Sequence, residues 1–272
     1  MKKSLINAVK LLLAVFIVAI TLFPLVYMGF AGFKSETEIM SRDFYLLPKV
    51  WDIENYQILL TDPLFIRSIW LTFIGAAAFA LAGSFISAMA AYAFARLEFP
   101  LKKVIWPIVL LTMFIPWMSI FVTSFITVTR LGMLDSLWVL IVPGLASAAN
   151  VFFFRQFYLF FPPALEEAAI IDGCGRFGIF MRIFIPNSLS ILVIVSIMRF
   201  MGYWNSYIWA VMTISNKEIY TIMQRLSYFR TEYGNNWGVI MAGASIAAIP
   251  PLILLGIFQK HIIRGVKIAG IK

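Results

Sequence analysis

Residues 162–186 read PPALEEAAIIDGCGRFGIFMRIFIP, a charged segment within a C-terminal half that is otherwise strongly apolar. The two leading prolines suit the first turn of a helix, and the acidic pair that follows is favoured at its positive N-terminal end. Gly173 predicts the end of that helix, because a turn between two short helices favours a residue that tolerates positive φ. A second short helix is predicted over 176–185, and Pro186 is expected to end it. The segment therefore predicts two short helices joined by a glycine turn.

The composition places the rest of the chain in a lipid bilayer. Hydrophobic residues make up 62% of the sequence and charged residues 13%, and the mean hydropathy is +0.91. A soluble fold of this composition would have to expose more apolar surface than water tolerates. One cysteine and one histidine exclude an intramolecular disulfide and disfavour a metal site built from this chain alone. The net charge of +9 is spread between apolar runs, so nucleic acid is not an expected partner.

Long apolar stretches predict six membrane-spanning helices, because about 20 such residues cross the hydrocarbon core. The expected spans are 11–33, 68–95, 104–129, 136–160, 187–212 and 235–259. The first is longer than the apolar core of a signal peptide and lacks a convincing cleavage site, so we expect it to be retained. We therefore predict an all-α integral membrane protein that forms a single transmembrane domain over 1–272.

Two further patterns in the expected spans concern helix packing and helix shape. Small side chains recur every fourth residue of the second span and favour a close approach of another helix. These residues are Ala76, Ala80, Ser84 and Ala88. Prolines cannot donate the backbone bond of a helix interior and are candidates for kinks. They are Pro24, Pro107, Pro116 and Pro143.

Lysine and arginine are unevenly distributed between the two sides of the expected membrane. They are concentrated in the segments that six spans place on one side, namely 2–10, 96–103, 155–182 and 260–272. Positive residues accumulate on the cytoplasmic side of membrane proteins. Both termini, the 162–186 loop and the tail 260–272 are therefore predicted to be cytoplasmic.

The chain shows no motor of its own. No GxxxxGK[ST] sequence occurs, so ATP binding by a P-loop is not expected. The six expected spans contain no Asp, Glu or His, which disfavours a proton- or ion-coupled carrier with an intramembrane relay. The stretch 173–178 matches GxGxxG, but it follows a helical pattern rather than a strand, so nucleotide binding is not expected there. No catalytic or metal-binding residue is predicted, and the chain is not expected to be an enzyme.

Arg199 is the one charged residue of the fifth expected span, where a central position would cost roughly 2.5–3.5 kcal/mol. On a helix, one stripe holds Arg199, Gly202, Tyr203 and Ser206, with Asn205 at its flank. Such a stripe suits a water-filled path for hydroxyl-rich solutes, since arginine donates hydrogen bonds and an aromatic ring can stack on sugar C–H groups. A polar clasp between helices, or snorkelling of Arg199 toward the membrane surface, is the open alternative.

The segment 162–186 contains three features in a fixed order. They are Glu167-Ala168-Ala169, then Asp172-Gly173, then Ile183, Ile185 and Pro186. Together they closely resemble the EAA loop of ABC importer permeases, specifically the maltose-type carbohydrate-uptake branch with MetI-like architecture. In that family the loop is the coupling element that docks into a cleft of the cytoplasmic ATPase. The resemblance implies that the coupling residues are Glu166, Glu167, Ala168, Ala169, Asp172 and Gly173. A solvated helix face is the alternative for the acidic members.

The resemblance extends beyond the loop. A Gly202-Tyr-Trp-Asn205 stretch with Trp209, and the tail from Gln259 onward, are similar to sugar permeases. Membership would imply a second homologous permease, two copies of a cytoplasmic ATPase that bind ATP and Mg²⁺, and an external sugar-binding protein. This chain would then need no cofactor and would carry a sugar or oligosaccharide across a bacterial cell membrane by alternating access. An ABC permease for a non-sugar solute and an ion-coupled carrier are the alternatives.

Overall fold

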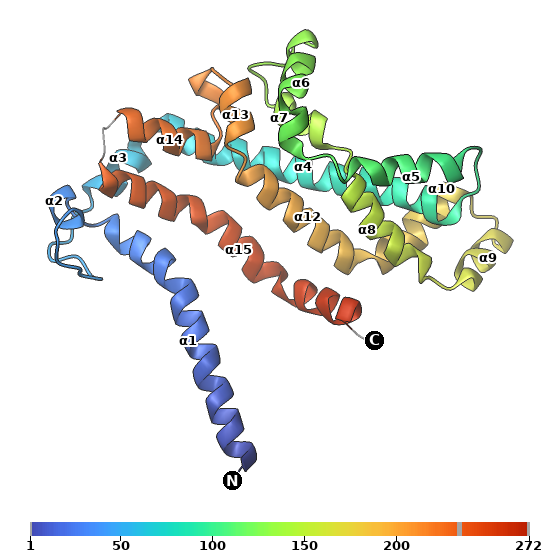
Figure 1. Ribbon diagram of the computed structural model, residues 1–272, viewed down its shortest axis with the longest axis horizontal. Coiled ribbons are helices and arrows are strands. Elements are labelled where there is room, and N and C mark those ends of the chain that lie inside the picture. The colour runs from blue at the N-terminus through green and yellow to red at the C-terminus, as the bar shows by residue number, and fades with distance from the viewer. Residues whose placement is uncertain (1, 233–235, 271–272) are drawn as a thin grey trace. The chain divides into compact units, whose positions relative to one another are not determined.

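The computed structural model describes the backbone of residues 2–232 and 236–270, and side chains within 5–230 and 236–261. All regular structure in these residues is helical, and they contain no strand (Figure 1). The helices form two compact units. Residues 1–69 with 224–250 make up the first unit, and 70–223 with 251–272 the second.

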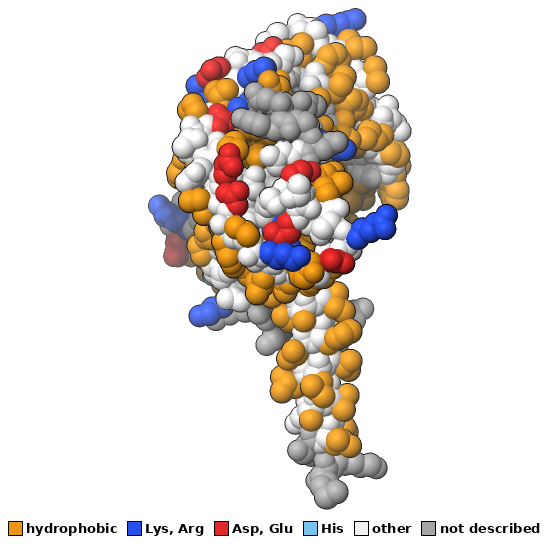
Figure 2. All heavy atoms as spheres, turned by 90° about the vertical axis from the view of Figure 1, so that its left-hand side faces the viewer, with side chains coloured by type: hydrophobic (Ala, Val, Ile, Leu, Met, Phe, Trp, Pro, Cys, Tyr) orange, Lys and Arg blue, Asp and Glu red, His pale blue; other side chains and the backbone are white. Residues whose placement is uncertain are grey.

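The first unit is built around polar contacts at the ends of its helices. It contains α1 (Lys2–Ala31), α2 (Glu36–Ile39), α3 (Glu54–Thr61), most of α14 (Ile222–Glu232), the start of α4 (Pro63–Arg96) and the first part of α15 (Trp237–Gly270). Asn55 donates to the carbonyls of Gly32 and Lys34, both at 3.0 Å. The Asp62 carboxylate accepts from Arg225 Nη2 at 2.6 Å. Side chains along 5–24 of α1 are exposed and largely apolar (Figure 2).

The second unit is organised around the long helix α4. It contains α5 (Lys102–Thr112), α6 (Trp117–Arg130), α7 (Trp138–Ile141), the 3₁₀ turn η1 (Val142–Gly144), α8 (Ala148–Leu159), α9 (Pro163–Ile171), α10 (Arg176–Ile179), the π turn η2 (Phe180–Phe184), α11 (Ile185–Asn187), α12 (Leu189–Trp204), α13 (Ile208–Thr213) and the 3₁₀ turn η3 (Lys217–Ile219). The small-residue stripe of α4 is buried, as predicted, at 0–3% exposure. Its Ser84 hydroxyl accepts from Ser196 of α12 at 3.0 Å.

Three described helices are long and apolar enough to cross a membrane: Leu5–Ala31, Pro63–Arg96 and Trp237–His261. Three further candidates are pairs of helices separated by a short break and bent by 102°, 47° and 81°. They are Lys102–Thr112 with Trp117–Arg130, Trp138–Gly144 with Ala148–Leu159, and Arg176–Asn187 with Leu189–Trp204. The number of spans reaches six if each bent pair is one span, so the six predicted spans stay a prediction. The last expected span and the tail 260–272 also include residues outside the described ones.

Two of the four prolines lie at helix breaks. Pro116 precedes α6 with an extended backbone, so the expected span 104–129 consists of two helices rather than one. Pro143 lies in η1, between α7 and α8. Pro24 and Pro107 lie inside helices. At Pro116 the backbone itself leaves the helical region, with ψ at 135°.

Candidate functional site

Helix α9 and the turn after it have the geometry that the sequence predicts. Pro162 caps the helix and Pro163 opens it. At its end the Gly173 N–H donates to the Ile170 carbonyl at 3.0 Å, and the Cys174 N–H donates to the Ala169 carbonyl at 2.9 Å. This pair of bonds is a Schellman motif, which ends a helix with one residue in the left-handed region. The φ angle of Gly173 is +77°, so the predicted positive φ is confirmed.

The second short helix departs from the prediction at its end. Helical backbone runs through α10, η2 and α11, and it continues past Pro186 to Asn187. The prediction that Pro186 ends the helix is therefore wrong. Pro186 follows the π turn η2, whose wider bonding already replaces the regular α-helical ladder, and the helix ends one residue later at Asn187. The π turn η2 lies directly before it, and π turns are rare insertions that often mark functional segments.

The inner side of the segment 162–186 packs on an aromatic cluster. The Phe184 ring lies 4.9 Å from Phe161 and 5.0 Å from Tyr158, measured between ring centres. It lies 4.8 Å from Tyr92 of α4. Ala169 is 8% exposed and belongs to the same buried cluster. A small residue at this position lets α9 approach the aromatic rings closely.

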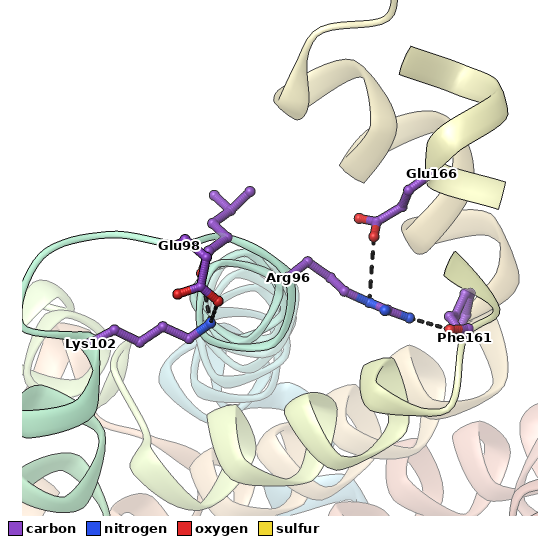
Figure 3. Close-up of polar contacts among 6 residues, drawn as sticks. Arg96, Glu98, Lys102, Phe161 and Glu166 are labelled. Atoms are coloured by element: carbon purple, nitrogen blue, oxygen red, sulfur yellow. Dashed lines mark hydrogen bonds and ion pairs between the residues drawn. The ribbon is translucent and has the colours of Figure 1, made fainter. Parts of the chain in front are cut away.

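Arg96, the last residue of α4, connects that helix to the segment 162–186. Its Nη2 donates to the Phe161 carbonyl, and its Nε lies 3.8 Å from Glu166 Oε2 (Figure 3). The guanidinium also lies 5.6 Å from the centre of the Phe184 ring. The Arg96 and Glu166 side chains are only 12% and 13% exposed, so water screens their attraction poorly. From the sequence, Arg96 is a basic residue after a span, at the end of the stretch Ala91–Arg96 that loosely resembles the permease family, and nothing in the sequence indicates Glu166 as its partner.

The structure divides the six predicted coupling residues between two faces. Glu166 and Ala169 lie on the inner side, where they meet Arg96 and the aromatic cluster. The exposed members are Glu167, Ala168, Asp172 and Gly173. Two large apolar side chains accompany them: Ile171 is 85% exposed and Phe177 is 61% exposed. Exposed apolar groups rimmed by charge are typical of a protein contact surface.

Arg199 of α12 forms a clasp in this structure. Its Nη2 donates to the Gly144 carbonyl at 2.8 Å and to the Leu145 carbonyl at 3.3 Å. Its Nε donates to the Phe79 carbonyl at 3.4 Å, and the guanidinium lies 4.3 Å from the centre of the Phe79 ring. The side chain is 6% exposed. Gly144 and Leu145 lie at the break between η1 and α8, where carbonyls lose their helical partners. The arginine therefore supplies the donors that the broken helix lacks.

Gly83 of α4 makes the clasp possible. A β-carbon at this position would collide with the Arg199 guanidinium. Gly75 plays the same part for the Tyr203 ring, which a β-carbon would also meet. These two glycines lie two helical turns apart on one face of α4. Nothing in the sequence marks these two glycines beyond the neighbouring stripe of small residues.

The predicted polar stripe of α12 is only partly present. Arg199 and Tyr203 are buried on the same side, and the Tyr203 ring lies 5.7 Å from Phe79. The helix ends at Trp204, so Asn205 and Ser206 belong to the following turn. Placing Ser206 on the helical stripe was therefore wrong, because the Ser206 N–H donates to the Tyr203 carbonyl at 3.0 Å and closes a tighter turn. Asn205 is exposed, and Ser206 lines a cavity with Gly144.

Comparisons with known proteins agree with this fold. A family model described as "Binding-protein-dependent transport system inner membrane component" matches residues 83–268. The probable ABC transporter permease protein YurM of Bacillus subtilis is 32% identical over 271 residues, which cover 98% of this chain and 88% of that protein. The arabinooligosaccharides transport system permease protein AraQ of Halalkalibacterium halodurans is 28% identical, covering 94% of this chain and 93% of that protein.

A solved structure extends the agreement to three dimensions. It is a bacterial ABC transporter involved in the import of the acidic polysaccharide alginate, and it matches with a TM-score of 0.80 at 22% identity. The match covers 96% of this chain and 97% of that chain. At this identity the likeness shows the fold, and the predicted all-helical permease fold is confirmed. The chain belongs to the family of binding-protein-dependent transport system inner membrane components, the permease subunits of ABC transporters.

Proposed function

We propose that this chain is the transmembrane subunit of an importer that carries a sugar or oligosaccharide into a bacterial cell. The observation that carries the proposal is the division of 162–186 into a fixed inner face and an exposed outer face. Arg96 and the aromatic cluster fix the inner face to α4, so a force applied to α9 is passed to a long helix. The exposed outer face offers apolar and acidic side chains to a motor protein.

In this proposal the loop 162–186, both termini and the tail 260–272 lie in the cytoplasm, and six spans cross the plasma membrane. Two copies of an ATPase bind ATP and Mg²⁺, and one of them docks on the exposed face of α9. A second homologous permease completes the passage, and an extracytoplasmic binding protein delivers the sugar. ATP-driven closure of the ATPase dimer moves α9 and reverses the direction in which the passage opens. This chain performs no covalent chemistry.

Sugar as the substrate class is supported by two findings of different kinds. The relative AraQ is named for arabinooligosaccharides, and the polar residues that follow α12 suit a solute rich in hydroxyl groups. A non-sugar solute such as an amino acid or phosphate is the competing substrate class. An ion-coupled carrier is disfavoured because the expected spans contain no Asp, Glu or His.

Reconstitution of the complete transporter tests the proposal. The permease pair, the ATPase and the binding protein are placed in lipid vesicles, and uptake is measured with radiolabelled arabinotriose, trigalacturonate, glutamine and phosphate. We expect ATP-dependent uptake of one of the two oligosaccharides. This subunit alone should neither hydrolyse ATP nor accumulate a sugar under a proton or sodium gradient. Gradient-driven uptake by the subunit alone would overturn the proposal, and uptake of glutamine or phosphate alone would overturn its substrate class.

A further inference from the structure

We propose that the second unit contains a subsite for one neutral sugar ring, in a cavity of about 190 Å³ between α6, α7 and the turn after α12. The inference rests on the proposed function and adds the place and chemistry of a contact with the substrate. The walls include Trp117, Trp209, Ser206, Gly144 and Pro143. The volume is several times the roughly 30 Å³ share of one water and below the roughly 300–1,000 Å³ of pockets for drug-sized ligands. It suits a single ring better than a whole oligosaccharide.

Two indole rings form the aromatic part of the cavity. The rings of Trp117 and Trp209 meet edge to face, with centres 5.5 Å apart and planes at 75°. Phe121 supports Trp209 at the same distance, with planes at 81°. Trp209 is 9% exposed, and its Nε1 donates to the Val139 carbonyl at 3.0 Å, which fixes its orientation. Trp117 is 48% exposed, so this chain leaves about half of its ring uncovered.

The chemistry of the walls favours a neutral sugar. A sugar ring presents C–H groups on its faces and hydroxyls on its edges, which match an aromatic face and a hydroxyl such as that of Ser206. The residues that line the cavity carry no charged side chain. A phosphate or carboxylate would therefore find no cation there, whereas the indole faces and the serine serve an uncharged ring.

Arg199 takes the part of a positioning residue. It does not line the cavity, but its guanidinium holds the carbonyl of Gly144, which does. It holds the Leu145 carbonyl as well, so both bonds fix the break between η1 and α8 from behind the cavity wall. The charge inside this helix would thus shape the subsite without meeting the sugar.

The test uses the complete transporter in vesicles and the neutral sugar arabinotriose. Trp117→Leu keeps an apolar side chain but removes the ring face, and we expect initial uptake to fall about five- to tenfold. Trp117→Phe keeps a ring face and should retain at least half of the uptake. Trp138→Leu is the matched control, because Trp138 is 65% exposed and does not line the cavity. It should transport like the unsubstituted protein.

Ser206→Cys in a Cys174→Ala background provides a second measurement that needs no uptake. A small water-soluble thiol reagent should modify this cysteine, and arabinotriose should slow the reaction while phosphate does not. Normal uptake by Trp117→Leu, equal losses for the Leu and Phe variants, or no protection by arabinotriose would overturn the subsite. If the unsubstituted transporter takes up neither oligosaccharide, the proposed function fails first. Uptake restricted to trigalacturonate preserves that function and overturns the neutral subsite.

Discussion

Two largely covered arginines of the second unit, Arg96 and Arg199, find partners for their guanidinium groups in different ways. Arg96 at the end of α4 has a carboxylate partner in Glu166, together with the carbonyl of Phe161. Arg199 within α12 has carbonyl acceptors and the Phe79 ring among its described contacts, and each of these partners is neutral. An ion pair at the end of a helix can separate when water enters, whereas a donor that caps a broken helix in a bilayer has no substitute. The Arg96–Glu166 contact is suited to two segments that move relative to each other. The Arg199 contacts are suited to segments that stay fixed.

The largest loss of stability is expected from replacing Arg199. Arg199→Leu leaves the carbonyls of Gly144 and Leu145 without their donor, and each such group costs about 1–3 kcal/mol when buried. We expect a lower midpoint of thermal unfolding for the detergent-purified complex. The midpoint of Arg199→Lys should lie between those of the unsubstituted protein and Arg199→Leu, because a single ammonium lacks the rigid fork of the guanidinium. An unchanged midpoint for Arg199→Leu would show that other groups satisfy these carbonyls.

Gly83→Ala disturbs the same Arg199 contacts from the side of α4. The new methyl group would occupy the place of the guanidinium, and overpacking of this kind costs about 1–3 kcal/mol. In an Arg199→Ala background the same change should cost less than about 0.5 kcal/mol, since the collision partner is gone. Thermal unfolding of the single and double variants measures the difference. Gly202→Ala is the control, because Gly202 has open space around it. Equal costs in both backgrounds would contradict the collision.

Gly173→Val tests the turn after α9 rather than the contacts of Arg199. A β-branched residue at φ +77° costs about 1–2 kcal/mol, which is enough to change the turn without unfolding the spans. We expect normal membrane levels, with uptake and binding-protein-stimulated ATP hydrolysis falling together. Gly175→Val is the matched control, because Gly175 has an extended backbone at φ −69° and open space around it. Normal coupling in Gly173→Val would show that the turn does not transmit motion.

The sequence predicted features that depend on local chain conformation and missed those that depend on distant partners. The glycine turn follows from a few consecutive residues, so its positive φ could be predicted. The Arg96–Glu166 pair joins segments far apart in the chain, and no periodicity reveals it. The prediction that Ser206 lies on the helical stripe was wrong because it extended the helical periodicity past Trp204. The helix ends at Trp204, and a tighter turn follows it. The prediction for Pro186 missed by one residue, since the helical backbone continues from the π turn η2 through Pro186 to Asn187.

Arg96→Gln is expected to have a moderate effect. It removes a largely buried attraction of about 1 kcal/mol but keeps a donor for the Phe161 carbonyl. Lys102→Gln is the control, because its partner Glu98 is 90% exposed and the 3.1 Å pair is a surface one (Figure 3). We expect Arg96→Gln to lower coupled uptake at both low and physiological ionic strength, because salt screens this largely buried pair little, whereas Lys102→Gln should leave uptake unchanged at both. An equal response of both variants would remove the distinction between the two ion pairs.

The smallest change in stability is expected from Glu167→Lys, and it isolates the outer face of α9. Glu167 is exposed and lies one residue after Glu166, which faces Arg96. Glu167 is the fifth residue of α9, beyond its first turn, so reversing its charge costs less than about 0.3 kcal/mol through the helix dipole, too little to unfold the loop. A large fall in uptake at normal membrane levels would therefore report a lost contact with the motor. Glu167→Gln separates the loss of the negative charge from the gain of a positive one. It removes the charge without reversing it and should retain intermediate uptake. If Glu167→Lys transports normally, the motor contacts the loop through Ile171 and Phe177 instead, and the acidic residue belongs to a solvated helix face.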